Sequence, residues 1–145
     1  MRNNDVEPVF WRLSIKPGRP MAGSIRSGKP VMCVPGNPVA AFVCYRLAAA
    51  PVLDRMAGGI ARPLLRPRVK CGFDHRKSAG RAEYLRVKVT TDAAGEPEMH
   101  LHGRKGAGVL SSLTGADGLV EIPVENTGVA VGDYLPFILF RESGL

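Results

Sequence analysis

A buried strand, a tight turn and the start of a helix are predicted by the stretch Val31-Met32-Cys33-Val34-Pro35-Gly36-Asn37-Pro38-Val39-Ala40-Ala41-Phe42. Residues 31–34 form a short apolar run, which Pro35 and Gly36 interrupt. Asn37 is a good N-cap, and Pro38 then takes the first helical position, where its missing N–H costs nothing. Such a helix start presents N–H groups and a partial positive charge, which can bind an anion. The same pattern also fits a strand-to-helix connection that binds no ligand.

Length and composition indicate a small globular protein. With 145 residues the chain is one domain or two small ones, and its 45% hydrophobic content is enough for a core. No apolar run approaches the roughly 20 residues that a membrane-spanning helix needs, and the first five residues lack the apolar core of a signal peptide. The cysteines Cys33, Cys44 and Cys71 have no metal-ligand spacing, and the surroundings of Cys33 and Cys44 predict burial. We therefore expect a cytoplasmic protein with no membrane partner.

The charge is unevenly distributed along the chain. The net charge is +7, but residues 1–88 contain 17 Lys and Arg against 5 Asp and Glu, whereas residues 89–145 contain 3 against 8. A basic first part favours an anionic partner, although it also fits an ordinary solvated surface. Aromatic residues make up only 6% of the chain and do not interleave with basic residues, as a nucleic-acid stacking platform requires. We therefore expect a small anionic partner and no nucleic acid.

Three cations lie close together near the start of the chain. Residues 7–15 alternate as a strand, with Val9, Trp11, Leu13 and Ile15 predicted on one face. Arg12 and Lys16 occupy alternate positions, so their heads are expected on one side of that strand. Lys16-Pro17-Gly18-Arg19-Pro20 then forms a rigid basic loop. The three cations suit a phosphate or pyrophosphate, and the loop also fits an ordinary basic turn.

The segments that follow predict a hairpin and a helix. Residues 21–29 indicate a strand end and a turn around Ser27 and Gly28. A helix is expected from Pro38 to about Ala57, because apolar residues recur there at helical spacing. Pro51 predicts a kink or two short helices that meet there, and Gly58-Gly59 predicts the helix end.

The second half of the chain has the pattern of an all-β domain. A linker over residues 62–67 leads into short alternating segments, which are residues 68–73, 82–90, 98–103, 118–122 and 134–140. Strands at this spacing indicate a small barrel or sandwich. The first half alone has too little surface to bury a core, and its buried strand needs neighbours on both sides. The predicted fold class is therefore an α/β fragment, residues 1–60, followed by a small all-β barrel domain, residues 61–145.

Four motifs follow one another along the chain. They are residues 10–20 (FWRLSIKPGRP), residues 34–39 (VPGNPV), residues 80–86 (GRAEYLR) and residues 103–118, which contain Gly103-Arg104-Lys105-Gly106, Leu110-Ser111-Ser112-Leu113 and Ala116-Asp117-Gly118. In this order they resemble the C-terminal part of the molybdopterin molybdenumtransferases, the MoeA and gephyrin E-domain family. The likeness covers nearly all of residues 8–140. Each motif is weak alone, but four in order at fitting distances are specific.

The resemblance implies a biosynthetic activity and a domain plan. Family members insert molybdate into adenylylated molybdopterin (molybdopterin-AMP) and release AMP, with a divalent metal that is usually Mg²⁺, and they act as homodimers. Residues 1–60 would be the C-terminal portion of a MogA-like molybdopterin-binding domain, and residues 61–145 the C-terminal β-barrel. The family's metal-holding carboxylates lie upstream of the residues present here. We therefore expect no metal ligands in this chain and no insertion activity from the chain alone.

The resemblance also assigns site residues. The catalytic positions fall on Arg12, Lys16 and Arg86. The substrate-binding positions fall on Arg19, Pro35, Gly36, Asn37, Pro38 and Arg81. Cationic heads and helix N–H groups would bind the pyrophosphate-type linkage, the AMP and the molybdate, and would stabilise charge on the departing phosphate.

The chain departs from the family pattern at several of these positions. Arg12 and Arg19 stand where lysine is usual, which keeps the charge but changes the hydrogen-bond geometry. Lys105 stands where glutamine is usual and Ala107 where serine is usual, so the polar contacts of that loop differ.

Three other interpretations stay open. A binding or scaffold module on the same barrel would have a peptide groove and would keep its binding when Arg86 becomes alanine. A nucleic-acid binder would lose affinity steeply with salt. His100 and His102 alternate on one predicted strand as a metal pair would, but with His75 they show no third ligand, and a structural role also fits.

Overall fold

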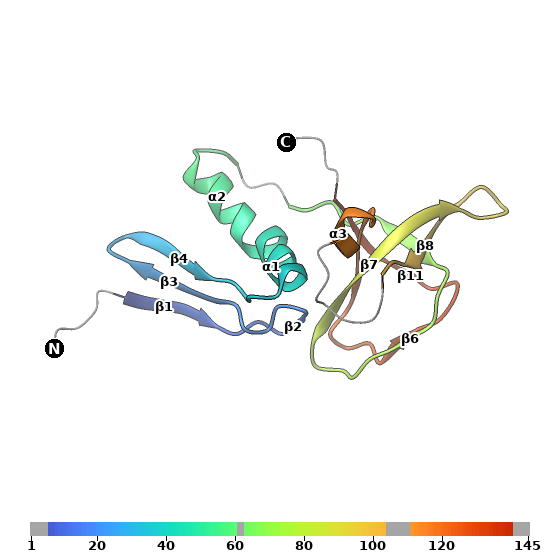
Figure 1. The fold of residues 1–145 in the computed structure, drawn as a ribbon, viewed down its shortest axis with the longest axis horizontal. Helices are drawn as coiled ribbons and strands as arrows, with labels where there is room; N and C mark the ends of the chain where they lie inside the picture. The colour runs from blue at the N-terminus through green and yellow to red at the C-terminus, as the bar shows by residue number, and fades with distance from the viewer. Residues whose placement is uncertain (1–5, 61–62, 104–110, 141–145) are drawn as a thin grey trace.

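A computed structural model describes residues 6–60, 63–103 and 111–140, and it has an α/β part followed by a β-barrel (Figure 1). The strands of the α/β part are β1 (Val6–Trp11), β2 (Ile15–Lys16), β3 (Ala22–Arg26) and β4 (Lys29–Cys33). Its helical segments are α1 (Pro38–Cys44), a π-helical turn (Tyr45–Ala49) and α2 (Ala50–Met56). No described helix is both long and apolar enough to cross a membrane.

Strands β1, β3 and β4 form an antiparallel sheet in the order β1-β3-β4. The hairpin between β3 and β4 turns at Ser27 and Gly28, which have φ angles of 47° and 73°. Two consecutive positive φ angles are the geometry of a tight two-residue hairpin turn. The predicted turn is therefore confirmed.

The prediction of one continuous strand over residues 7–15 is wrong. β1 ends at Trp11, and Arg12 has a φ of 70°, a left-handed conformation that breaks the strand. The chain resumes as the two-residue strand β2, which pairs with a different sheet. Arg12 and Lys16 therefore do not alternate on one strand face. Val9 and Trp11, which were predicted on one strand face with Leu13 and Ile15, are 62% and 77% exposed.

The prediction of a buried strand at residues 31–34 is also wrong for this structure. Strand β4 pairs with β3 alone, and Val31 and Val34 are 41% and 47% exposed. Cys33, predicted to be buried, is exposed, whereas Cys44 is buried as predicted. The apolar pattern is present, but the described residues supply a neighbour on only one side of the strand.

The predicted helix forms, with an interruption next to its proline. The π-helical turn directly precedes α2, in which Pro51 takes one of the first two positions. A proline ring inside a regular helix would strike the carbonyl four residues earlier, and a wider turn gives it space. After Met56 the chain leaves the helix through Gly58, whose φ is 82°, so the predicted glycine end is confirmed.

The barrel strands are close to the predicted segments. They are β5 (Arg68–Cys71), β7 (Ala82–Thr91), β8 (Pro97–Leu101), β9 (Gly118–Ile122) and β11 (Tyr134–Leu139). The order β7-β8-β5-β11-β9 closes on itself because β9 also pairs with β7. Two short strands, β6 (His75–Arg76) and β10 (Gly128–Val129), pair with each other, and the short helix α3 (Ser111–Thr114) lies beside β7 (Figure 1).

The barrel interior is a closed apolar core. Val87 and Met99 have no exposed surface, and they pack with inward side chains from the other strands. Leu85 and Val89 alternate with Val87 along β7 and pack against the same cluster. The turn between β7 and β8 is held by Asp92, whose Oδ1 accepts hydrogen bonds from the N–H groups of Ala94 and Glu96.

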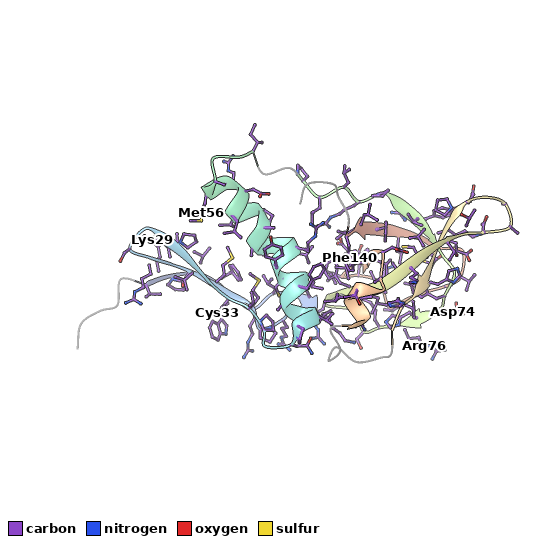
Figure 2. All side chains as sticks on the ribbon, turned by 45° about the horizontal axis from the view of Figure 1, so that its top comes forward. Lys29, Cys33, Met56, Asp74, Arg76 and Phe140 are labelled. Carbon is purple, nitrogen blue, oxygen red and sulfur yellow. The ribbon has the colours of Figure 1, made fainter. Side chains whose placement is uncertain are left out.

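A second apolar cluster joins the barrel to the α/β part. Val43 of α1 packs with Ala82 and Tyr84 of β7 and with Leu119 and Ile138. The rings of Phe42 and Phe140 meet edge to face at 4.9 Å, and Figure 2 shows Phe140 beside the helix. β2 also pairs in parallel with the start of β7. We call this junction the seam: it comprises the apolar cluster between α1 and the barrel and the pairing of β2 with β7. An α/β part followed by a small barrel is the predicted fold class, which is confirmed.

Candidate functional site

An ion-pair network centred on a buried carboxylate lies at the seam. The parallel register of β2 and β7 sets Lys16 opposite Glu83. The Lys16 Nζ lies 2.9 Å from the Glu83 Oε1, and the His75 Nε2 lies 3.2 Å from the Oε2. The Glu83 side chain is only 5% exposed, whereas the Lys16 side chain is 58% exposed. Both carboxylate oxygens therefore have a partner, and the ammonium still faces solvent.

The charge state of Glu83 follows from these partners. Burial by itself raises the pKa of the Glu83 carboxyl, because it disfavours the charged form. The hydrogen bonds from Lys16 and His75 act in the opposite direction and outweigh burial, so the pKa of Glu83 lies below its ordinary value. Glu83 is accordingly a carboxylate at neutral pH, and it holds a cation at the edge of the barrel.

The basic loop before β3 is closed by backbone hydrogen bonds. The Arg12 N–H donates to the Met21 carbonyl at 3.0 Å, and the Leu13 N–H donates to the Arg19 carbonyl at 3.0 Å. Arg12, Lys16 and Arg19 are all exposed. The loop therefore presents three cations to solvent from one compact turn, although not through the strand alternation that the sequence predicted.

Gly18 fixes this loop against helix α1. Its φ is 119°, and a Cβ at this position would lie 2.8 Å from both the Cys44 Sγ and the Ile15 Cδ1. The Cys44 thiol also points at the Gly18 carbonyl oxygen, 3.6 Å away. Because only glycine fits this approach, the cationic loop is held to the helix that follows the Pro35–Pro38 turn.

The helix start does not offer free N–H donors in this structure. The Asn37 Oδ1 accepts hydrogen bonds from the N–H groups of Val39 and Ala40, at 3.0 and 3.2 Å. The Asn37 carbonyl accepts from Ala41, and Pro38 has no N–H. The predicted N-cap is confirmed, and it takes the donors that the sequence assigned to an anion. Pro35 and Gly36 lead into this turn, and Gly36 is exposed with open space around it.

Arg86 lies on a different face of β7 from Glu83. Side chains three positions apart on a strand point to opposite faces. Arg86 pairs with Leu119 and shares the face of Ala82 and Tyr84, which pack against helix α1. Arg81 is exposed just before β7 begins. The structure thus brings Lys16 to the Glu83 face and Arg86 to the helix face, with the edge of β7 between them.

Among the described residues, the three histidines belong to no group that could hold a metal ion. His75 is engaged with Glu83, and the His100 Nε2 lies 3.1 Å from the Glu98 Oε1. Residues 6–60, 63–103 and 111–140 contain no group of three or more His, Cys, Asp and Glu side chains that could hold a metal ion. The described residues therefore do not fit Mg²⁺. Lys105 and Ala107 lie outside the described residues.

Glu83 was not predicted as a site residue, and His75 was considered only together with His100 and His102. Glu83 lies within the motif at residues 80–86, whose predicted site residues are Arg81 and Arg86. One signal was available, because Glu83 alternates with Leu85, Val87 and Val89 and so belongs to the inward face of the strand. An acidic residue at an inward position needs a partner, since a buried charge is costly without one.

Comparisons with known proteins agree with this architecture. The sequence profile of the MoeA C-terminal region (domain IV) matches residues 68–140. The chain is 35% identical over 141 residues to the molybdenum cofactor synthesis protein cinnamon of Drosophila melanogaster, covering 90% of this chain and 22% of that protein. It is 30% identical over 135 residues to molybdopterin molybdenumtransferase 2 of Mycobacterium tuberculosis, covering 92% and 32%.

Solved structures show the same likeness. The molybdopterin biosynthesis moeA protein of Pyrococcus horikoshii superposes with a TM-score of 0.72 at 26% identity, over 92% of this chain and 32% of that one. A molybdenum cofactor biosynthesis protein of Pyrococcus furiosus gives 0.73 at 27% identity, over 93% and 46%. The chain spans less than a third of the length of the two curated relatives. Because the profile of the MoeA C-terminal region matches residues 68–140, half of the chain, the chain belongs to the MoeA family.

Proposed function

We propose that the chain acts in molybdenum cofactor biosynthesis, as the C-terminal part of a transferase that inserts molybdate into adenylylated molybdopterin and releases AMP. One observation carries the proposal. Relatives named molybdopterin molybdenumtransferase match 84% to 92% of this chain, which spans both the cationic loop and the barrel. The domain plan expected from the resemblance, residues 1–60 as part of a MogA-like domain and residues 61–145 as the barrel, belongs to this proposal.

The proposed insertion of molybdate requires fixed positive charge beside the ligand more than it requires a nucleophilic side chain. The proposed substrate carries a pyrophosphate-type linkage, the leaving group is AMP, and molybdate is itself an anion. Cationic side chains beside these groups would bind them and would stabilise the negative charge that develops on the departing phosphate. In the proposal Arg12, Lys16 and Arg86 carry this role. Lys16 lies on β2 and Arg86 on β7, the two strands that pair at the seam, and Arg12 lies in the loop between β1 and β2.

The remaining site residues would shape and hold the ligand. Arg19 and Arg81 are exposed on the loop and at the start of β7. Residues 35–38 would line the site as a turn, because Asn37 already uses the nearby N–H groups. Their contribution is therefore shape and orientation, with the charge supplied by the arginines and by Lys16.

The assembly and the metal belong to the proposal as well. We propose a homodimeric, cytoplasmic protein whose partner is a small anionic substrate, without nucleic acid or membrane. Mg²⁺ is assigned to no described residue of this chain, so the carboxylates that hold it would come from elsewhere in the working enzyme. The 145-residue chain alone is accordingly proposed to have no insertion activity.

Equilibrium binding tests the cationic site. Adenylylated molybdopterin would be titrated into the chain and into the variants Lys16→Ala and Arg86→Ala. Each variant is expected to weaken binding by about tenfold, because a hydrogen bond to a charged group contributes roughly 1.5–3 kcal/mol and solvent exposure reduces this. Lys29→Ala is the matched control, because it removes one positive charge from the hairpin turn, far from the seam (Figure 2).

The same titration separates the alternatives. Equal affinities for the wild type and for Arg86→Ala would contradict a substrate role for the barrel arginine, and they are what a binding or scaffold module predicts. A uniform loss in all three variants, Lys29→Ala included, would indicate attraction by net charge and not a site.

A further inference from the structure

The seam holds a charged group that the proposed function does not use. Among the described residues, Glu83 is the buried residue with a charged side chain. A buried carboxylate is unfavourable unless it is paired and hydrogen-bonded. Its position on the inward face of β7 is otherwise lined by apolar side chains such as Leu85 and Val87. An apolar residue would suit this position for packing alone, so packing does not explain the glutamate.

The partners of Glu83 come from two different parts of the fold. Lys16 lies on β2, at the end of the α/β part, and His75 lies on the short strand β6 beside the barrel. Each contacts a different carboxylate oxygen, at 2.9 and 3.2 Å. Two contacts on opposite oxygens fix the rotation of the carboxylate, so the direction in which Lys16 is held is also fixed.

The ammonium group of Lys16 is held on one side by Glu83 and is open to solvent on the other. An ammonium group has three N–H donors, and Glu83 accepts from one side of it. The Lys16 side chain is still 58% exposed, whereas those of Glu83 and His75 are 5% and 16% exposed. The network therefore runs from the largely buried side chains of His75 and Glu83 to the solvent-exposed ammonium group of Lys16.

We propose that Glu83 is a positioning residue that orients Lys16 toward an anionic ligand, and that His75 holds Glu83 in the orientation that does so. This inference rests on the proposed function, because it takes Lys16 as a ligand-binding group. A lysine that is already ordered loses less conformational freedom when it binds, and so binds more tightly. The ligand class is a phosphate ester or anhydride, for which inorganic pyrophosphate is a suitable probe.

The sign of one affinity change separates positioning from simple charge. Removing a carboxylate beside a cation would strengthen anion binding if charge alone mattered. Removing a positioning group weakens it. We expect Glu83→Leu to weaken pyrophosphate binding by about threefold, with a smaller loss in Glu83→Gln, which keeps a neutral acceptor. In a Lys16→Met background the same Glu83 substitutions are expected to leave the affinity unchanged.

The experiment uses the full 145-residue chain with labelled lysine side chains. NMR relaxation at the Lys16 Cε and Nζ gives the order of the side chain, with the exposed hairpin residue Lys29 as a reference in the same sample. We expect Lys16 to be more ordered than Lys29 in the wild type, and to approach Lys29 in Glu83→Leu and in His75→Leu. Glu121→Gln is the matched control, because Glu121 lies on the neighbouring strand β9 and forms its ion pair with Arg66, which precedes β5.

Each outcome decides the proposal. Loss of Lys16 order together with weaker pyrophosphate binding supports it. Unchanged order of Lys16 in Glu83→Leu, or binding that is equal or tighter, overturns it. If Lys16→Met binds pyrophosphate as tightly as the wild type, the proposed function of Lys16 fails first. If Lys16→Met weakens binding and Glu83→Leu does not, only the positioning role fails.

Discussion

At the scale of single residues, the buried carboxylate of Glu83 is the main charged feature of the seam, and it holds Lys16 of β2 against β7. Glu83 has both oxygens engaged, and its neighbours on the same strand face are apolar. A surface ion pair contributes little, but a carboxylate taken out of water depends on its partners. The lowered pKa of Glu83 shows that those partners more than offset the effect of burial.

This balance predicts how stability changes with pH. Because the pKa of Glu83 is lower in the folded chain, its ionised form stabilises the fold above the unfolded pKa of about 4.3. That contribution is lost as the pH falls through the folded value. We expect the free energy of unfolding to fall more steeply in the wild type than in Glu83→Gln as the pH is lowered from 5 to 3. Urea unfolding at a series of pH values measures both, and parallel curves would refute the assignment.

At the scale of elements, most strands and the helix could be predicted from the sequence. The barrel strands alternate clearly, and Asn37 with Pro38 marks the helix start by local chemistry. Two features were not local. The strand break at Arg12 depends on the chain turning back to bond with Met21, and the exposure of Val31 depends on which strands lie beside it. The alternation of apolar and polar residues predicts neither the strand break at Arg12 nor the exposure of Val31.

The helix cap gives a prediction at this scale. Asn37→Ala would leave the N–H groups of Val39 and Ala40 without their side-chain acceptor. We expect a loss of about 1 kcal/mol in the free energy of unfolding. Urea denaturation measures it, and Asn37→Asp is the control because aspartate caps equally well. An Ala variant as stable as the wild type would show that the cap does not stabilise α1.

At the scale of the whole molecule, the site could be predicted only in part. The motifs predict Lys16 and Arg86 as site residues, and the structure places both on elements that meet at the seam, while their roles stay a prediction. The contact of Lys16 with Glu83, and the position of Arg86 on the opposite face of β7, follow from the pairing of β2 with β7 and from the alternation of side chains along β7. The pairing of β2 with β7 sets Lys16 beside Glu83, 67 positions along the chain, so no local pattern encodes it.

The free energy of unfolding of a variant at the seam tests whether helix α1 and the barrel form a packed interface. Val43 is fully buried in the cluster that joins helix α1 to the barrel. Val43→Ala is expected to lower the free energy of unfolding by about 1–3 kcal/mol, through lost apolar contact and the cavity left behind. Val9→Ala, on exposed β1, is the control and is expected to change it by less than about 0.5 kcal/mol. Equal effects in urea unfolding would mean that the seam is not a packed interface.

We propose that this chain provides the C-terminal part of a molybdenum-inserting enzyme. The most direct test is a chimera in which the chain replaces the matching region of the Mycobacterium tuberculosis molybdopterin molybdenumtransferase 2, which it matches over 92% of its own length. The measured quantity is molybdate-dependent release of AMP from adenylylated molybdopterin. We predict release by the chimera, a loss of at least about tenfold in its Lys16→Ala and Arg86→Ala forms, and none from the 145-residue chain alone. A folded chimera that releases no AMP would rule out this role, and turnover by the chain alone would show that the chain needs no further residues for the reaction.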